Sequence, residues 1–566
     1  MTLYQWFVFF LFIQIVHFSG TWKLYEAAGR NKWEAAIPVY NAIVLMKIIS
    51  RPTWWTLLLF IPIINLIMFP VIWVETLRTF GKRSQLDTIL GIVTFGLYIY
   101  YVNYTQKLEY TKERNLDPKN KTGDTISSLL FAIIVATLVH TYFVQPYTIP
   151  TSSLEKSLLI GDFLFVSKVN YGARVPMTTV ALPMVHDSIP MTKRKSYLSW
   201  PLLPYLRLPG IEDEIKRTDI VVFNWPVDTV HYFFEAKGKP GVIKPIDKKS
   251  NYVKRCLGIP GDSLAIKDGI VFINGKELIL PERAKPQYEH TIYSVKGVSN
   301  ELLKAAGSTE FSRTYIIKPN NDAQLEAIRP YITYADQNQD GTYTIRTGFN
   351  GIPANVIEKT GLYAQEQYLA ETSANLTLKG AEELRKNKSI DSIVRYIDKQ
   401  KGGSSIFPHN GLWTMDEYGP ILIPKAGETV QLDSKNISLY ERIINTYEKN
   451  KLEINGNEIK INGEITNNYT FKQNYYWMMG DNRHHSEDSR YWGYVPEDHI
   501  VGKPVFIWMS WDTNGKGLNK VRWDRVFTTV SGEGQPQSYF KIFLILLAAF
   551  FVGEYFWKKR KEKNNI

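Results

Sequence analysis

Apolar stretches near both ends of the chain enclose a long polar part. Residues 126–145 and 538–557 are mostly apolar, and each is about as long as a helix that crosses a bilayer. Both stretches are therefore predicted to be transmembrane helices. Basic residues precede the first helix and follow the second one; they are Lys107, Lys112, Arg114, Lys119, Lys121, Lys558, Lys559, Arg560 and Lys561. Because basic flanks remain in the cytoplasm, the roughly 390 residues between the helices are predicted to lie outside it.

Three further apolar blocks precede these helices, at residues 3–18, 54–74 and 89–102. Only the second block is comfortably long enough to cross a bilayer. The first block has no basic start and no Ala-x-Ala cleavage pattern, so it is interpreted as an anchor and not as a removed signal peptide. The basic residues that follow the second block fit no simple topology, which indicates that one block is re-entrant or interfacial. The number of N-terminal spans stays open.

The part between the two long helices alternates short β-branched and aromatic runs with Gly, Asn and Pro. This pattern covers residues 163–225 and 259–295 and predicts an antiparallel β core. Asn-Gly pairs at 274–275 and 462–463 stand between strand-like runs, and each predicts a hairpin. The predicted fold class is therefore mainly β, with an antiparallel catalytic core and several transmembrane helices.

The β pattern is interrupted between residues 286 and 403 by polar segments with helical stretches, such as residues 379–400. We interpret residues 286–403 as an α/β insertion or cap subdomain. Closely spaced prolines at 176–209 indicate an extended loop near the membrane. The predicted organisation is an N-terminal membrane region (1–105), a basic cytoplasmic segment (106–125), a transmembrane helix (126–146), a first core part (147–285), the insertion (286–403), a second core part (404–535), a transmembrane helix (538–557) and a basic tail (558–566).

Composition narrows the partners and excludes some kinds of site. The 566 residues carry a net charge of +12, but the basic residues cluster beside the predicted spans and form no aromatic-interleaved stripe. Anionic lipid headgroups are therefore the expected partner, and nucleic acid is not. Cys256 is the single cysteine, which excludes an intrachain disulfide and a multi-cysteine zinc site.

The segment from Gly480 to Gly493 combines turn formers, charges and two serines between aromatic runs. Asp488 and Arg490 are two residues apart and would share a face if the chain were extended there. Taken alone, the segment could be a charged surface loop. Two other segments make a functional site the better interpretation: Ile149 to Leu154, directly after a predicted membrane helix, and Tyr252 to Asp262, a strand-like run that ends in Pro-Gly-Asp.

Together these three segments resemble the signature boxes of bacterial type I signal peptidases, which are membrane-bound serine-lysine proteases. Supporting boxes occur at residues 218–223 and 413–420. The resemblance covers roughly residues 126–275 and 405–510, and it leaves the N-terminal region and the insertion outside.

The resemblance implies that Ser153 is the nucleophile and Lys254 the general base. A serine hydroxyl needs a base, and a lysine can serve if burial keeps it neutral. Lys254 lies in an apolar strand-like run, where a solvated edge charge is the simpler interpretation without the companion segments. By resemblance, the Thr151 hydroxyl and the Ser153 amide would donate to the oxyanion. Ser486 would orient the lysine, while Asp488 and Arg490 would brace the site.

The first box departs from the pattern of the family. Thr151 replaces a serine, Leu154 a methionine and Lys156 a proline. The threonine keeps a hydroxyl and the leucine keeps apolar bulk. Lys156 raises an alternative, because Ser153 and Lys156 also form the S-x-x-K pattern of penicillin-recognising serine enzymes.

That alternative has further partial support from Lys-Thr-Gly at residues 359–361 and Ser-Ala-Asn at 373–375. Their order is the reverse of that in the penicillin-recognising enzymes, and the segments around Lys254 and Ser486 would stay unexplained.

Other motifs favour structural roles. Residues 336–341 resemble the start of a calcium loop, but Thr347 stands where a glutamate is needed, which favours a plain Asp-Gly turn. His484 and His485 have no companion ligands at metal spacing and are interpreted as a solvated polar loop. Cys256 is interpreted as a small core residue.

The resemblance thus implies a membrane-bound serine endopeptidase that removes signal peptides after small residues through an acyl-enzyme. It would need no cofactor and no metal. Its expected partners are signal-peptide-bearing preproteins, the lipid bilayer and the secretion translocon, and its expected location is the bacterial inner membrane with the catalytic domain on the extracytoplasmic side. Two alternatives are a catalytically inactive envelope scaffold and a protein whose main role lies in its N-terminal membrane region, although few charges occur there for a solute path.

Overall fold

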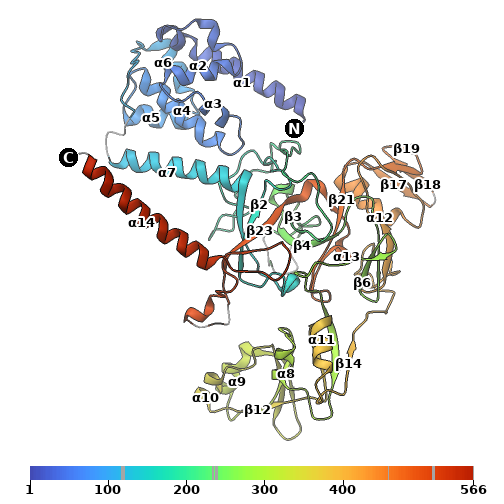
Figure 1. The fold of residues 1–566 in the computed structure, drawn as a ribbon. Helices are drawn as coiled ribbons and strands as arrows, with labels where there is room; N and C mark the ends of the chain where they lie inside the picture. The colour runs from blue at the N-terminus through green and yellow to red at the C-terminus, as the bar shows by residue number, and fades with distance from the viewer. Residues whose placement is uncertain are drawn as a thin grey trace.

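The computed structural model describes residues 1–116, 121–231, 235, 240–456, 458–512, 515 and 517–564. An N-terminal group of helices, a central β core and two long helices that extend from the core are visible in Figure 1. Lys119 of the basic segment, the Lys561 side chain and the last two residues of the tail lie outside what the structure describes.

Three helices within the described residues are long and apolar enough to cross a membrane. They are α1 (Leu3–Ala27), the continuous segment Lys121–Phe143, which contains α7 (Lys121–Leu138), and Phe540–Arg560 within α14 (Phe540–Asn564). Helices α5 (Gln85–Val93) and α6 (Tyr98–Thr105) meet at 120° and together form a fourth candidate as a broken span or a re-entrant loop. The prediction of several transmembrane helices is confirmed.

The expectation that residues 54–74 are the one N-terminal block comfortably long enough to cross a bilayer is wrong, because α1 has that length and residues 54–74 do not form one helix. This stretch is divided into α3 (Trp55–Leu58) and α4 (Asn65–Thr79). Pro62 lies in the break, and the next residue, Ile63, has a φ of 71°. Proline cannot continue the helical hydrogen bonding. The two helices instead pack with α2 (Tyr40–Ile48) in a buried cluster that includes Leu45, Leu58 and Met68.

An antiparallel sheet forms the centre of the core and joins both ends of the polar part. Its strands are ordered β1-β2-β23-β3-β4-β21-β22, and β24 also pairs with β23. The bounds are β1 (Val144–Thr148), β2 (Asp162–Ser167), β3 (Ile220–Asn224), β4 (Asn251–Gly258), β21 (Tyr475–Met479), β22 (Val495–Pro496), β23 (Ile500–Ser510) and β24 (Thr528–Thr529). Strand β1 begins directly after the segment Lys121–Phe143, so the sheet continues from the membrane helix. The mainly β, antiparallel fold class is confirmed.

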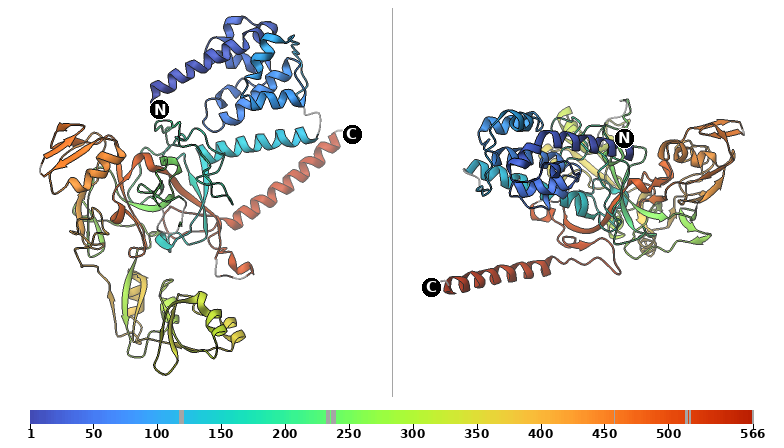
Figure 2. Two further views of the ribbon diagram at one scale, coloured as in Figure 1. Left: turned by 180° about the vertical axis from the view of Figure 1, so that it is seen from behind. Right: turned by 90° about the horizontal axis from the view of Figure 1, so that it is seen from above.

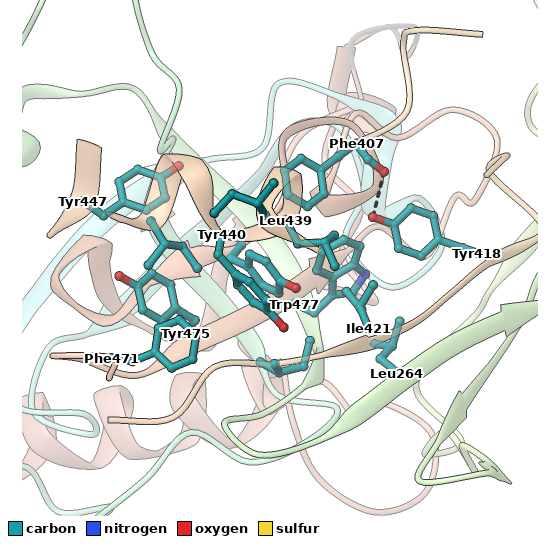
Figure 3. Close-up of a cluster of buried hydrophobic side chains, with 14 of the residues drawn as sticks. Leu264, Phe407, Tyr418, Ile421, Leu439, Tyr440, Tyr447, Phe471, Tyr475 and Trp477 are labelled. Atoms are coloured by element: carbon teal, nitrogen blue, oxygen red, sulfur yellow. Dashed lines mark hydrogen bonds between the residues drawn. The ribbon is translucent and has the colours of Figure 1, made fainter. Parts of the chain in front are cut away.

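A second antiparallel sheet, ordered β15-β5-β6-β7, packs beside β21. It contains β5 (Ser263–Lys267), β6 (Ile270–Ile273), β7 (Lys276–Glu277) and β15 (Tyr418–Leu422). Figure 3 shows the aromatic cluster that joins the two sheets, in which Trp477 lies among Phe407, Tyr418 and Tyr440. The Tyr418 hydroxyl donates to Phe407 O at 2.9 Å. Packing of Trp477 and Tyr475 fixes β21, which leads directly into the segment that begins at Gly480.

Both predicted Asn-Gly hairpins are confirmed. Asn274 and Gly275 connect β6 to β7, and Asn462 and Gly463 connect β18 (Glu458–Ile461) to β19 (Glu464–Ile465). Strand β17 (Leu452–Asn455) completes this small sheet, and β16 (Thr429–Gln431) pairs separately with β20 (Asn468–Thr470). Helix α12 (Ile437–Arg442) packs over the aromatic cluster.

Residues 286–403, which we call the insertion subdomain, carry two small antiparallel sheets and four short helices among the described elements. One sheet is β13 (Glu371–Thr377), β8 (Gln287–Tyr293) and β14 (Ser392–Arg395); the other is β10 (Ile332–Gln337), β11 (Tyr343–Thr347), β9 (Arg313–Lys318) and β12 (Tyr363–Gln367). The helices are α8 (Asn300–Ala305), α9 (Asp322–Ile328), α10 (Ala354–Thr360) and α11 (Leu378–Arg385). These helices and sheets extend below the core in Figure 1 and in the left view of Figure 2.

The predicted helix at residues 379–400 is correct only at its start. Helix α11 ends at Arg385, and the chain then forms β14, whose Ile393 is paired with Ile292 of β8. Sheet pairing and burial of Ile393 override the helical composition of this stretch. The Asp-Gly turn predicted at residues 336–341 is confirmed, because it connects β10 to β11.

The proline-rich residues 176–209 form the predicted extended loop, which folds back on itself. Isolated bridges pair Thr178 with Leu202 and Ala181 with Tyr197. The Trp6 indole of α1 donates to Leu202 O at 3.1 Å. The loop therefore contacts a candidate membrane helix.

Candidate functional site

Ser153 and Lys254 meet in the interior of the core. Ser153 lies in a 3-10 turn, η3 (Ser152–Leu154), which follows β1, whereas Lys254 lies in the middle of β4. Lys254 Nζ donates to Ser153 Oγ at 2.7 Å. Ser153 and Lys254 are 7% and 3% exposed. The two residues are far apart in sequence, so tertiary structure brings them together.

The surroundings of Lys254 favour its neutral form. Val221 of β3 pairs with Lys254 in the middle of the sheet, so the lysine is not at an edge. Burial lowers the pKa of Lys254 to about 8, and the carboxylates of Asp488 and Glu487 act in the opposite direction. A lysine with this pKa is substantially unprotonated near pH 8 and can accept a proton from a hydroxyl.

Most of the segment from Gly480 to Gly493 is buried, so the interpretation as a charged surface loop is wrong. Asp488 has an extended backbone but is the N-cap of α13 (Ser489–Trp492), so the chain is not extended from Asp488 to Arg490. Its carboxylate forms a buried ion pair with Arg490, with an Nη2–Oδ2 distance of 2.8 Å. The amide of Gly480 donates to the same carboxylate at 3.1 Å. This pair thereby closes the loop against the end of β21.

Ser486 and Ser153 both lie against Gly480, whereas Thr151 directly precedes the turn that contains Ser153. A Cβ added to Gly480 would lie 2.6 Å from Ser153 O and closer still to Ser486 Oγ, so these two serines flank the same glycine. Ser486 Oγ is buried and has no hydrogen-bond partner among the described residues. Thr151 has extended backbone before η3, and its side chain does not cap that turn. The proposed roles of Ser486 and Thr151 stay predictions.

Asp481 and Arg255 form a second buried ion pair, to which the sequence analysis gave no role. Arg255 Nη2 lies 2.6 Å from Asp481 Oδ2, and Ser157 Oγ donates to the same oxygen at 2.5 Å. Lys254 and Arg255 are neighbours on β4, and Asp481 follows Gly480. This pair therefore connects β4 to both the η3 region and the loop. The one sequence feature that could have indicated this ion pair is the arginine directly after Lys254.

Asn482 fixes the turn that contains Ser153. Its amide donates to Ser153 O, and its side-chain Nδ2 donates to Ser152 O, both at 3.1 Å. Asn482 is fully buried. No charge or catalytic chemistry marks this asparagine in the sequence, so sequence reasoning missed it.

Lys156 does not contact Ser153 through any hydrogen bond among the described residues. It lines a cavity of about 370 Å³ together with Lys285 and Arg255. Burial lowers the pKa of Lys156, and the neighbouring Lys285 lowers it further. Lys359 is on the surface near the end of α10, within the insertion subdomain. The S-x-x-K interpretation is therefore not favoured by the position of these lysines.

The interpretation of His484 as a solvated loop residue is wrong. Its side chain is buried, and His484 Nε2 lies 3.0 Å from Asp416 Oδ2. Asp416 belongs to the supporting box at residues 413–420, so this contact links that box to the loop. Cys256 is fully buried in an apolar cluster, as predicted. Among the described residues, no three His, Cys, Asp or Glu side chains are grouped as ligands of a metal ion.

Comparisons with known proteins identify the family of the chain. The family described as "Signal peptidase, peptidase S26" matches residues 122–324 and 422–511, which is more than half of the chain. The chain belongs to the signal peptidase S26 family. Residues 33–113 match a separate family described as "Family of unknown function (DUF5684)". The extra N-terminal region thus has relatives of its own.

Curated relatives named "Signal peptidase I" match this S26 member, two of them over most of the chain and another over a shorter part. The protein from Buchnera aphidicola subsp. Schizaphis graminum is 24% identical over 432 residues, which are 75% of this chain and 88% of the relative. The protein from Buchnera aphidicola subsp. Acyrthosiphon pisum is 21% identical over 425 residues, 75% of this chain and 87% of the relative. A Rickettsia canadensis relative is 27% identical over 167 residues, 29% of this chain and 49% of its own length.

Gly480→Ala is expected to impair the site of this S26 member although it adds only one methyl group. The added Cβ would overlap Ser486 Oγ and the backbone oxygen of Ser153, so η3 must shift. A shift of about 1 Å at a reacting group can reduce the rate by about a hundredfold. The rate at which an activated nitrophenyl ester acylates Ser153 is therefore expected to fall by that order.

Gly553→Ala is the matched control for this prediction, because a Cβ at Gly553 meets no atom within 4 Å. Unchanged acylation of Gly480→Ala would show that the glycine is not required by packing against Ser153.

Proposed function

We propose that this S26 member is a membrane-bound serine endopeptidase that cleaves signal peptides from exported preproteins after small residues. The single observation that carries the proposal is the buried contact of Lys254 Nζ with Ser153 Oγ at 2.7 Å. Membership of the S26 family supports the same function.

In the proposed reaction, neutral Lys254 removes the proton of the Ser153 hydroxyl as its oxygen attacks the scissile carbonyl carbon. Lys254 then gives this proton to the leaving amine as the peptide bond breaks. Water then attacks the ester carbonyl carbon while Lys254 takes a proton from it, and Lys254 returns this proton to Ser153 Oγ as the ester C–O bond breaks and the carboxylic acid leaves. The Ser153 amide and the Thr151 hydroxyl would stabilise the oxyanion, each such donor typically contributing about 3 to 4 kcal/mol.

Asp488 and Arg490 would brace the site of this reaction. Their mutual ion pair leaves the carboxylate close enough to act on Lys254, yet burial keeps the pKa of Lys254 at about 8. Ser486, whose buried hydroxyl has no hydrogen-bond partner among the described residues, would orient the lysine.

The expected location is the bacterial inner membrane. Basic residues precede α7, and Lys558, Lys559 and Arg560 lie at the end of α14, so both flanks fit the cytoplasmic side. The core between these helices would then be extracytoplasmic. There it would meet preproteins that emerge from the secretion translocon beside the bilayer.

A preprotein with an Ala-x-Ala cleavage site tests the proposal. The full chain, purified in detergent, is expected to cleave after the second alanine, because the pockets implied by the resemblance admit only small side chains one and three residues before the cut. Changing the alanine directly before the cut to tyrosine is expected to abolish cleavage at that bond. Mass spectrometry of both products identifies the bond.

The Ser153→Ala variant, purified in the same way, controls for contaminating proteases. Absence of cleavage by the wild-type chain, while Ser153 still reacts with an activated ester, would reject the proposed substrate and leave a serine nucleophile of other specificity. Absence of both reactions would favour an inactive scaffold.

A further inference from the structure

A carboxylate of the insertion subdomain reaches the turn that contains the nucleophile. Glu310 lies between α8 and β9, and its Oε2 accepts hydrogen bonds from His485 Nδ1 at 2.6 Å, Asn482 Nδ2 at 2.9 Å and Asn375 Nδ2 at 3.0 Å. The Ser152 hydroxyl donates to the same carboxylate. Glu310 therefore joins η3, the loop after β21 and strand β13.

Only one residue separates Glu310 from Ser153 in this network. Asn482 donates to Glu310 and, through its backbone amide, to Ser153 O at 3.1 Å. Its side-chain oxygen accepts from Asn375 at 2.6 Å. All polar atoms of the Asn482 side chain are thus used, and its orientation depends on partners that belong to the insertion subdomain.

Glu310 is ionised under ordinary conditions. Burial by itself would raise its pKa, but the hydrogen bonds from His485, Asn482 and Ser152 hold the pKa at about 2. The side chain of Glu310 is 23% exposed. Hydrogen bonds to a charged acceptor in such a place are stronger than those between neutral groups. The ionised carboxylate therefore restrains Ser152 and Asn482 more firmly than a neutral acceptor would.

We propose that Glu310 is a positioning residue for Ser153, so that the insertion subdomain completes the active site instead of serving as a separate module. The inference rests on the proposed function for its substrate. It assigns to Glu310 the task of holding Ser152 and Asn482, and thereby the Ser153 oxygen, at the distance from Lys254 that proton transfer needs.

Glu310→Gln tests the inference in the full chain, because glutamine keeps the size of the side chain and removes its charge. The kcat for preprotein cleavage is expected to fall by about tenfold, whereas KM stays within about twofold, because Glu310 acts on the nucleophile and not on the substrate. Glu358→Gln, an exposed position on α10, is the matched control and is expected to leave both constants unchanged. An unchanged kcat, or a change in KM alone, would overturn the inference.

The burst of nitrophenol from an activated nitrophenyl ester separates this inference from the proposed function, because it needs no preprotein. After subtraction of the Ser153→Ala background, the burst rate is expected to fall by about tenfold in Glu310→Gln. If wild-type protein shows the burst but cleaves no preprotein, the proposed substrate fails and the burst rates alone decide the role of Glu310.

Ser152→Ala provides a second variant that removes one hydroxyl and leaves the insertion subdomain intact. Because Ser152 and Glu310 are joined by a hydrogen bond, their effects on the burst rate are expected to be non-additive in a double-mutant cycle. Additive effects would overturn the positioning role. So would a burst rate in Glu310→Gln that equals the wild-type rate once each protein is assayed at the same interval below its own Tm.

Discussion

Lys254→Met is expected to lower kcat for preprotein cleavage by about a thousandfold, because a general base typically contributes between about a hundredfold and ten-thousandfold. Methionine resembles the lysine side chain in length but cannot accept the proton of Ser153. The position is 3% exposed, and replacing a buried amine by an apolar group does not destabilise the fold through lost solvation. The Tm is therefore expected to stay the same or rise.

The pH dependence of the wild-type enzyme checks the same residue independently. In the proposed reaction Lys254 acts as the neutral amine, and its pKa is about 8. Below that pH, kcat/KM is expected to fall by about tenfold for each pH unit, and above it kcat/KM should level off. A stopped assay of preprotein cleavage between pH 6 and about pH 10 measures this profile.

Lys156→Met is the matched control, because Lys156 is a nearby, partly buried lysine that forms no hydrogen bond with Ser153 among the described residues. We expect this variant to keep the wild-type pH profile. Loss of cleavage in Lys156→Met but not in Lys254→Met would show that Lys156, and not Lys254, is the base. It would thereby restore the S-x-x-K interpretation.

Asp481→Asn is expected to destabilise the core by about 3 to 5 kcal/mol, because it leaves the buried Arg255 guanidinium without a counter-charge. Arg255 and Asp481 have side-chain exposures of 4% and 1%, so water cannot replace the lost carboxylate. For a domain of this size, such a loss lowers Tm by roughly 10 °C. Differential scanning fluorimetry of the full chain in detergent measures the shift.

Two further variants separate the effect of charge burial from loss of contacts. Glu453→Gln breaks the exposed pair with Lys451 and is expected to change Tm by less than about 1 °C. The double variant Arg255→Met, Asp481→Leu removes both charges and is expected to recover much of the lost Tm. A Tm for Asp481→Asn equal to that of the wild type would mean that the pair contributes little to stability.

The Ser153–Lys254 pair could be predicted because the segments that contain the two residues resemble signature boxes of a known family; composition alone would have left Lys254 as a solvated edge charge. The sequence did not allow Glu310 or Asn482 to be predicted, because their importance comes from tertiary contacts. Glu310 lies in the insertion subdomain, where neither spacing nor composition marks one glutamate among many. His484 illustrates the same limit: its burial depends on Asp416, which is distant in sequence.

Local composition also failed where tertiary packing or a single proline decided the structure. Residues 54–74 have the apolar content of a membrane span, yet Pro62 and Ile63 break the helix. The β core, in contrast, could be predicted well, because Asn-Gly turns and β-branched runs specify hairpins within a few residues. Strand order could not be predicted, since β23 pairs with β2 and β3 across more than 250 residues.

The membrane segment Lys121–Phe143 continues directly into β1, so the length of the chain limits how far Ser153 can lie from the end of this segment. Ser153 follows Phe143 by ten residues, with no linker between the helix and the sheet. Even a fully extended chain of that length spans only about 35 Å. Under the proposed function, Ser153 cannot lie farther than this from the end of its membrane segment. Scissile bonds at a greater distance from the bilayer would be out of its reach, so this distance would select substrates together with their sequence.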